Sequence, residues 1–271
     1  MKCLPDAYFA YSKNLNFVVA DKLDMLSISS QPRIDLSEHE VGREACHACC
    51  FTQRAFNQET HGICGPISVL HAFAQDAPDR FGGFAGEVCQ KDARLVPENL
   101  VDEFNGVRKH NTLVRILSAY LTNGQNTLMT YEGSNSIGDY LACTAFPSDI
   151  VVWLEKVFPN REVTSYSSYC WGAVDNAEAV NQLWASSERQ PIIIAFVNGY
   201  RIQSKQDKVA YSLPGILGIL GGAGHYVHIT SPFQKVEDGY EFKAYNFGMD
   251  HTYRFSESEF EKVFYGLMVA C

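Results

Sequence analysis

The hydrophobic pattern of this chain changes from a helical to a strand period near residue 190. Before that point, apolar residues recur at helical spacing, and several segments open with a Ser, Thr or Asn that suits a helix N-cap. The predicted helices cover residues 96–104, 112–122, 148–157 and 176–187. After that point, short β-branched and aromatic runs are separated by turn residues, which indicates antiparallel strands. The predicted strands lie within residues 191–199, 225–233, 240–248 and 251–256.

An α+β fold with two lobes follows from this change of pattern. We expect a helical lobe over about residues 56–190 and a β lobe over about residues 191–271. Residues 1–55 are interpreted as an N-terminal extension of open role. Within it, residues 15–20 have the character of a strand, and the acidic residues 35–44 suit either a short helix or a loop. No repeat, low-complexity tract or linker marks a further domain boundary.

Composition limits the partners that such a fold can have. The 271 residues are 46% hydrophobic, and 22 Lys+Arg against 31 Asp+Glu leave a formal charge of −9. This charge disfavours nucleic acid or an anionic membrane surface as a partner. No apolar run reaches the roughly 20 residues of a membrane span, and the opening residues lack a signal-peptide core. We therefore expect a cytoplasmic chain with a protein or peptide substrate. Export by a signal-independent route and the oligomeric state stay open.

The cysteines are interpreted as free thiols. There are nine of them, an odd number scattered without a regular spacing, which does not suit a disulfide framework. Cys46, His47, Cys49 and Cys50 have the spacing of half a zinc site. No second pair of ligands follows at a suitable distance, so we predict no metal and no cofactor.

One thiol, Cys64, has a context that suits catalysis. The residues after it have helical spacing, and Pro66 is tolerated in a first turn, so a helix is predicted to begin at or beside Cys64. The partial positive charge of a helix N-terminus favours a thiolate, which is nucleophilic near neutral pH. We predict Cys64 as the nucleophile, with its own N–H and the side-chain amide of Gln58 as oxyanion donors.

The thiolate needs a base, and His225 and His228 are the histidines that lie in a strand pattern far downstream. Strand alternation places them on opposite faces, so we expect one of them to face the cleft. His225 is preferred because it opens its strand directly after a glycine-rich segment. Asn246 or Asp250 could orient the imidazole. Asn246 is preferred because it ends the next strand, where Phe247 could cover the pair.

The segment over residues 212–224 is apolar and rich in glycine, and it is too short to span a membrane. Its position just before His225 predicts a mobile flap over the site. We expect its apolar side chains Leu213, Ile216, Leu217 and Leu220 to help line the substrate cleft. Further substrate contacts are predicted at His61, Gly62 and Gly224.

Taken together, these motifs resemble the papain-like superfamily of cysteine peptidases. The shared order is a Gln six residues before Cys-Gly at a helix start, then Gly-His-Tyr-Val opening a strand, then Tyr-Asn-Phe-Gly closing another. The Cys-Gly-Pro-x-Ser motif, with later His-Tyr-Val and a Ser-x-x-Glu-Phe helix, is similar to the branch of double-glycine-leader peptidases and compact bacterial effectors. The resemblance covers about residue 57 to the C-terminus.

The resemblance implies a papain-like fold in which a helical lobe carrying the nucleophile packs on an antiparallel β lobe. It implies Gln58 in the oxyanion hole, Cys64 as nucleophile, His225 as base and Asn246 as the orienting residue. The branch usually has Asp-Pro where this chain has Asn246-Phe247. Residues 72–192 have no pattern of that branch, so substrate specificity is not transferred.

The predicted function is a cysteine hydrolase that cleaves a peptide, isopeptide or side-chain amide through a thioester at Cys64. An effector that acts on a host protein fits this class. Two alternatives stay open. One is a thioester-based acyltransferase of the transglutaminase or phytochelatin-synthase kind, and the other is a catalytically inactive binding protein on the same scaffold.

Overall fold

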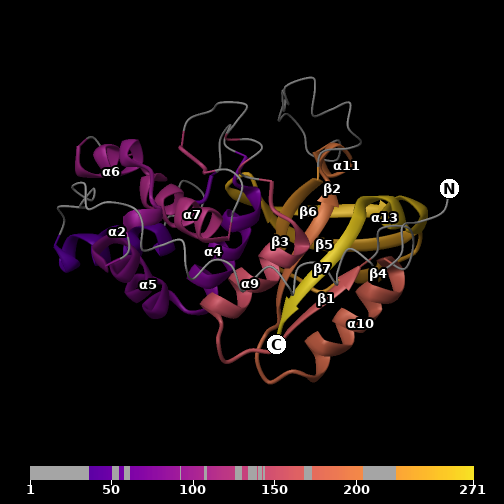
Figure 1. The fold of residues 1–271 in the computed structure, drawn as a ribbon. Coiled ribbons are helices and arrows are strands. Elements are labelled where there is room, and N and C mark those ends of the chain that lie inside the picture. Colours follow the sequence, from indigo (N-terminus) through magenta and orange to yellow (C-terminus); the bar gives the residue numbers. More distant parts are fainter. Residues whose placement is uncertain are drawn as a thin grey trace, which may run out of the picture.

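The described part of the chain has a helical side and a sheet side. A computed structural model of the 271-residue chain describes residues 37–50, 55–57, 62–91, 93–106, 109–125, 130–133, 139, 142, 144–167, 173–203 and 224–271. Within these residues the sheet is antiparallel, and most of the helices that precede it in sequence lie to one side of it (Figure 1). The α+β class predicted from the sequence is therefore confirmed.

The helical side is built around two buried helices. Its elements are α2 (Glu38–Cys50), α4 (Cys64–Asp76), α5 (Pro78–Lys91), the 3₁₀ turn η2 (Ala93–Leu95), α6 (Glu98–Asn105), α7 (Thr112–Gln125) and α9 (Pro147–Val157). Helices α4 and α7 are buried along most of their length and pack on each other. The predicted helix starting at Cys64 and those at residues 112–122 and 148–157 are confirmed. Within the described residues, no helix is long and apolar enough to cross a membrane.

The sheet contains seven described strands, all paired antiparallel. They are β1 (Val163–Ser167), β2 (Ile192–Asn198), β3 (Gly224–Ile229), β4 (Gln234–Val236), β5 (Gly239–Asn246), β6 (Met249–Ser256) and β7 (Phe264–Ala270). The order is β1-β7-β2-β3-β5, and both β4 and β6 also pair with β5. The predicted strands correspond to β2, β3, β5 and β6.

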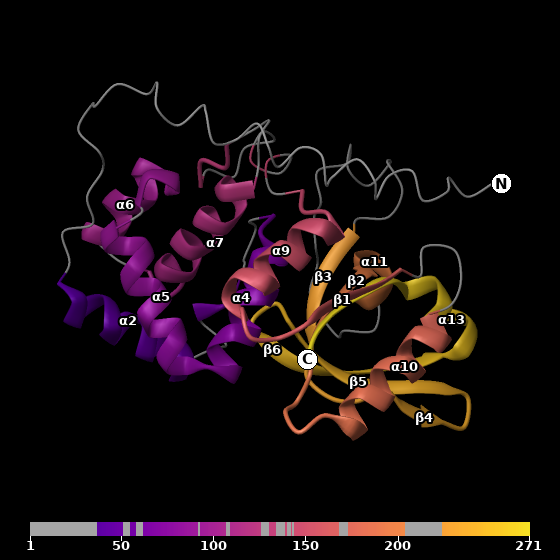
Figure 2. The same cartoon turned by 60° about the horizontal axis from the view of Figure 1, so that its bottom comes forward.

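Alternating side chains of the sheet face two separate hydrophobic clusters. In β2, Ile192 and Ile194 face the cluster that holds α4 and α9, whereas Ile193 and Ala195 face the other cluster. The second cluster is closed by α10 (Ala173–Ser186) and α13 (Glu257–Val263), and a short helix, α11 (Gly199–Gln203), follows β2. The sheet is therefore covered by helices on both faces (Figure 2).

The lobe boundaries predicted from the sequence differ from the structure. The strand β1 pairs with β7, and α10 packs against β7, so the β lobe begins before residue 191. At the other end, α2 turns Val41, Ala45 and Ala48 into the helical core, so part of residues 1–55 belongs to the helical side. Helix α5 and strand β7 were not predicted. The expected strand at residues 15–20 lies outside the described residues.

The seam between α4 and β3 joins the two sides of the molecule. The Ser68 hydroxyl on α4 donates to the Tyr226 carbonyl on β3 at 3.1 Å. Two turns from the start of α4, His71 Nδ1 lies 2.9 Å from His228 Nδ1, and the His71 ring stacks on Tyr245 at 3.4 Å between centroids. All of these groups are buried, which makes this polar seam part of the core.

Burial keeps the histidine pair of the seam neutral. It lowers the pKa of His228 to about 4. Burial also lowers the pKa of His71 well below its usual range, and the neighbouring charge of His228 adds to this effect. One of the two Nδ1 atoms must carry a hydrogen and donate it to the other, because two acceptors would repel each other.

We predict that the protein loses stability as the pH falls from about 6.5 to about 4. Each histidine has a folded pKa below its unfolded value of about 6.5, so the unfolded chain binds more protons in this window. For His228 alone the free energy of unfolding should fall by about 3 kcal/mol. Urea denaturation at several pH values measures this fall.

The matched control is the double variant His71→Leu/His228→Leu, which lacks both titrating groups. Its free energy of unfolding should fall less over the same pH range. An equal fall in the two proteins would contradict a role for the buried pair.

Candidate active site

The nucleophile predicted from the sequence lies at the first residue of α4. Ile63 precedes the helix without a side-chain cap, and no acidic residue lies in the first turn. The partial positive charge of the helix end therefore acts on the Cys64 thiol unopposed by a carboxylate of that turn. Gly65 is required next, because a Cβ there would lie 3.1 Å from both Ala145 Cβ and Ile150 Cδ1. The Cys-Gly pair thus lets α9 approach the start of α4.

The predicted base and orienting residue are in contact. His225 lies at the start of β3 and Asn246 at the end of β5, and the His225 Nε2 lies 2.7 Å from the Asn246 Oδ1. The Asn246 Nδ2 in turn donates to the Tyr253 hydroxyl on β6 at 3.1 Å. Asn246 and Tyr253 are buried. The amide is therefore held from both ends, with its oxygen turned to the imidazole.

Cys64 and His225 change each other's acidity. Burial raises the pKa of a thiol, but the positive charge of His225 and hydrogen bonds from His225, Tyr226 and Gly65 outweigh burial, so the pKa of Cys64 is lowered. Burial lowers the pKa of an imidazole, but the Cys64 thiolate and the Asn246 hydrogen bond outweigh it, so the pKa of His225 is raised. Because Nε2 is engaged by Asn246, Nδ1 is the nitrogen left for Cys64. Both shifts are toward the charged forms, a thiolate beside an imidazolium.

A strained turn covers this pair. Asn246 pairs with Met249, so Phe247 and Gly248 form the two-residue loop between β5 and β6. Their φ angles are 48° and 87°, both in the left-handed region. Gly248 adopts this conformation easily, but Phe247 does not, and residues such as Asn are more usual there. The Phe247 ring stacks on the His225 ring at 5.1 Å with an interplanar angle of 8°.

The two histidines of β3 both contact α4, which differs from the opposite faces expected from strand alternation, but His225 and not His228 lines the pocket beside Cys64, as predicted. His228 contacts His71, and His225 contacts Cys64 at the open end of the seam. The neighbouring strand β2 pairs with His225 through Val197, where its pairing with β7 is irregular. Such irregularities increase local twist and re-aim side chains.

The structure describes only some of the other predicted site residues. Gln58, His61 and Leu217 lie outside the described residues, as do Leu213, Ile216 and Leu220. Gly62 is partly buried two residues before Cys64. Gly224 is exposed beside His225, and the Phe196 ring occupies the space of its missing Cβ. Asp250 is exposed and accepts from Thr230 at 3.1 Å, so it does not replace Asn246.

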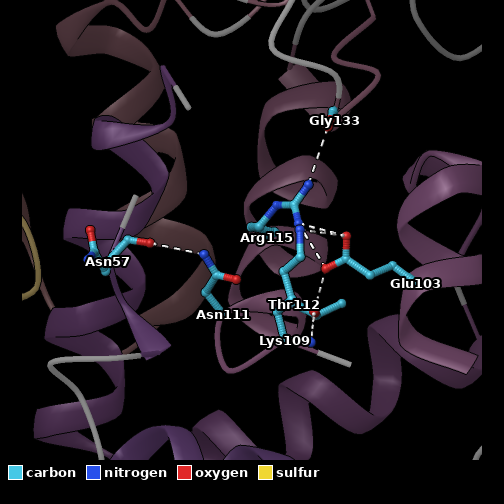
Figure 3. Close-up of polar contacts among 7 residues, drawn as sticks. All are labelled: Asn57, Glu103, Lys109, Asn111, Thr112, Arg115 and Gly133. Carbon is cyan, nitrogen blue, oxygen red and sulfur yellow. Dashed lines mark hydrogen bonds and ion pairs between the residues drawn. The ribbon is translucent and has the colours of Figure 1, made fainter. Parts of the chain in front are cut away.

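The carbonyl group of Asn57, upstream of the nucleophile, is held by a residue that the sequence did not reveal. The Asn111 Nδ2, just before α7, donates to the carbonyl oxygen of Asn57 at 3.3 Å (Figure 3). Asn57 directly precedes Gln58, the predicted oxyanion donor. Asn111 thus holds the last described residue before Gln58. Tyr253 was also missed, since nothing in its local sequence marks it.

The other cysteines have different surroundings. Cys46 is exposed, Cys49 is partly buried, and both are free thiols. In the described ranges no group of three or more His, Cys, Asp or Glu side chains could hold a metal ion. Cys89 is buried, and burial raises its pKa to about 12. Cys64 is thus unlike Cys89 in acidity, although both contact the same core.

The space beside Cys64 is small and mixed in character. A pocket of about 10 Å³, close to the volume that holds one water, borders Cys64, Ser68 and Asn246, with Phe56 and Tyr245 as aromatic walls.

Comparison of the chain with protein-family models, curated proteins and solved structures found no significant match. The case for a function therefore rests on the geometry of this site.

We predict that iodoacetamide at pH 7 modifies Cys64 before Cys46 and long before Cys89. In His225→Ala the positive charge is lost while burial stays. The pKa of Cys64 should then rise above the usual value of about 8.5, and its alkylation at pH 7 should slow by at least about tenfold. Peptide mass spectrometry over a pH series measures each rate. Earlier modification of several other thiols would rule out an activated Cys64.

A second prediction concerns the strained turn. Phe247→Asn should raise the free energy of unfolding by about 1 kcal/mol, because Asn accepts a positive φ more readily. The same change should slow Cys64 alkylation, because water then reaches the His225–Asn246 hydrogen bond. Phe247→Leu is the matched variant, which keeps the strain and removes the stacked ring. Unchanged alkylation in both variants would show that the ring has no part in activation.

Proposed function

We propose that this protein is a papain-like cysteine hydrolase with Cys64 as nucleophile, His225 as base and Asn246 as the orienting residue. The observation that carries the proposal is the connected set of contacts from the start of α4 through His225 to Asn246. The arrangement of a nucleophile on a helix start against an antiparallel sheet also supports a papain-like relationship. The substrate class is a peptide, isopeptide or side-chain amide.

The first half of the reaction breaks the amide bond. The Cys64 thiolate attacks the carbonyl carbon, and the carbonyl electron pair moves onto oxygen to give a tetrahedral oxyanion. The backbone N–H of Cys64 is suited to stabilise this oxyanion, together with Gln58. As the intermediate collapses, His225 transfers its proton to the leaving amine nitrogen. The products are a free amine and a thioester at Cys64.

The second half of the reaction releases the acid. His225 is now neutral and accepts a proton from water, which attacks the thioester carbonyl carbon. Collapse of the second tetrahedral intermediate expels the Cys64 thiolate, and the imidazolium is restored beside it. Asn246 accepts from the His225 Nε2–H throughout, so Nδ1 stays turned to the thiol and the incoming water.

The lowered pKa of Cys64 and the raised pKa of His225 favour catalysis near neutral pH. Below the lowered pKa of Cys64 the thiolate is protonated, and above the raised pKa of His225 the leaving amine has no proton donor. The rate should therefore follow a bell-shaped pH profile, and its two limbs should report the coupled titration of Cys64 and His225. The same thioester also serves acyl transfer to an amine, so the catalytic residues do not separate the two reactions.

The test uses a peptide library made by digesting a cell lysate. The wild-type protein should create new N-termini, and Cys64→Ala should reduce their rate of appearance by about 10⁴-fold or more. Asn246→Ala should retain more activity than Cys64→Ala, because the thiolate and imidazole both remain. Cys46→Ser, which changes an exposed thiol, is the matched control and should keep full activity.

Addition of methylamine separates hydrolysis from acyl transfer. Mass spectrometry that finds N-methylamides at the cleaved carbonyl as the main products would favour the acyltransferase. If Cys64 alkylates rapidly but neither new N-termini nor amides form with any library peptide, the binding-protein alternative would be favoured.

A further inference from the structure

We propose that α2 and the segment before α7 form a binding site for a phosphate group. A cleft of about 290 Å³ lies between these two parts of the chain, and it is separate from the residues around Cys64. Its lining residues are Arg43, Glu44 and His47 from α2, with Lys109 and His110 from the other side. This site does not depend on the proposed hydrolase activity.

The charge of the cleft is opposite to that of the chain. The whole chain carries a formal −9, yet the cleft is lined by a guanidinium, an ammonium and two imidazoles with one carboxylate, Glu44. A second carboxylate, Glu103, lies 3.8 Å from the Lys109 Nζ, and it is also paired with Arg115. Arg43 and His47 lie one helical turn apart, so both project from the same face of α2. Lys109 and His110 approach from a segment more than 60 residues later in the sequence. Cationic groups that converge from two segments suit a compact anion.

The turn that presents Lys109 and His110 is held by a partly buried network of hydrogen bonds and ion pairs (Figure 3). The Lys109 N–H donates to Thr112 Oγ1 at 2.9 Å, and Thr112 Oγ1 donates to Glu103 Oε1 at 2.6 Å. The Arg115 Nη1 donates to both Glu103 carboxylate oxygens, at 2.9 and 3.0 Å, and its side chain is only 5% exposed. The backbone of the turn therefore needs no reordering when an anion binds, which favours affinity.

The donor set fits a phosphate group better than a single carboxylate. A guanidinium can hold two phosphate oxygens, and imidazole N–H groups can donate to the remaining oxygens. The Lys109 side chain is 63% exposed, and its ammonium, which lies 3.8 Å from Glu103 Oε2, would turn from that carboxylate to the bound anion. The His47 and His110 rings are nearly parallel, with an interplanar angle of 14° and 5.9 Å between centroids. The stacked pair therefore joins the α2 side of the cleft to the side of His110.

The test is a titration of the full chain with inorganic phosphate, followed by amide NMR shifts and isothermal calorimetry. We expect saturable binding in the millimolar range or tighter, with the largest shifts at residues 43–47 and 109–110. Arg43→Gln/Lys109→Gln should weaken binding by at least about tenfold. Both side chains are exposed, so this variant should fold normally, which unchanged Cys64 alkylation would verify.

The matched control is Arg189→Gln/Lys235→Gln, which removes two exposed charges elsewhere and should leave binding unchanged. A phosphoserine peptide and its unphosphorylated form distinguish the source of the group. Tighter binding of the phosphopeptide indicates a phosphorylated partner, whereas binding of inorganic phosphate alone indicates a small ligand. The absence of saturable shifts, equal shifts with chloride, or wild-type affinity in Arg43→Gln/Lys109→Gln would overturn the proposal.

Discussion

The packing of α4 along β3 sets the geometry on which the candidate site depends. Seven residues of an α-helix rise about 10.5 Å, and three residues of a strand advance about 10 Å. The spacing from Cys64 to His71 on α4 therefore matches the spacing from His225 to His228 on β3. Both pairs of side chains meet across this seam, although His225 and His228 are an odd number of residues apart on their strand. The irregular pairing of β2 beside His225 accompanies its turn toward α4. The deep pair, His71 and His228, is held neutral by burial, whereas in the outer pair the pKa of Cys64 is lowered and the pKa of His225 is raised.

The same residue type behaves differently in this protein according to its electrostatic surroundings. Cys89 is surrounded by apolar side chains, and burial alone raises its pKa to about 12. Cys64 experiences the same kind of burial, but a helix N-terminus and an imidazolium reverse the direction of the shift. The imidazolium in turn depends on Asn246, whose amide is fixed by Tyr253 on a third strand. The acidity of one thiol is thus a property of α4, β3, β5 and β6 together.

The sequence revealed those parts of the fold whose patterns are local. A helix starting at Cys64 and the strands with His225 and Asn246 could be predicted, because periodicity and turn residues mark them. The strand β7 could not, because it is covered on both faces and its apolar run has no alternation. Helix α5 was hidden by its glycines, which are poor helix formers. The parts played by Tyr253 and Asn111 depend on partners brought close only by the fold. The cationic cleft is of the same kind, because α2 and Lys109 meet only in the folded chain.

The order of the strands along the chain has a consequence for when Cys64 gains its partners during synthesis. Strand β1 pairs only with β7 among the described strands, and β7 also pairs with β2. A ribosome therefore makes Cys64, and most of the helical side, long before the strands that complete the sheet have emerged. Until residues 224–246 are in place, Cys64 lacks His225, which lowers its pKa, and His225 lacks Asn246, which orients its ring. At that stage a nascent chain therefore carries Cys64 without the contacts that lower its pKa.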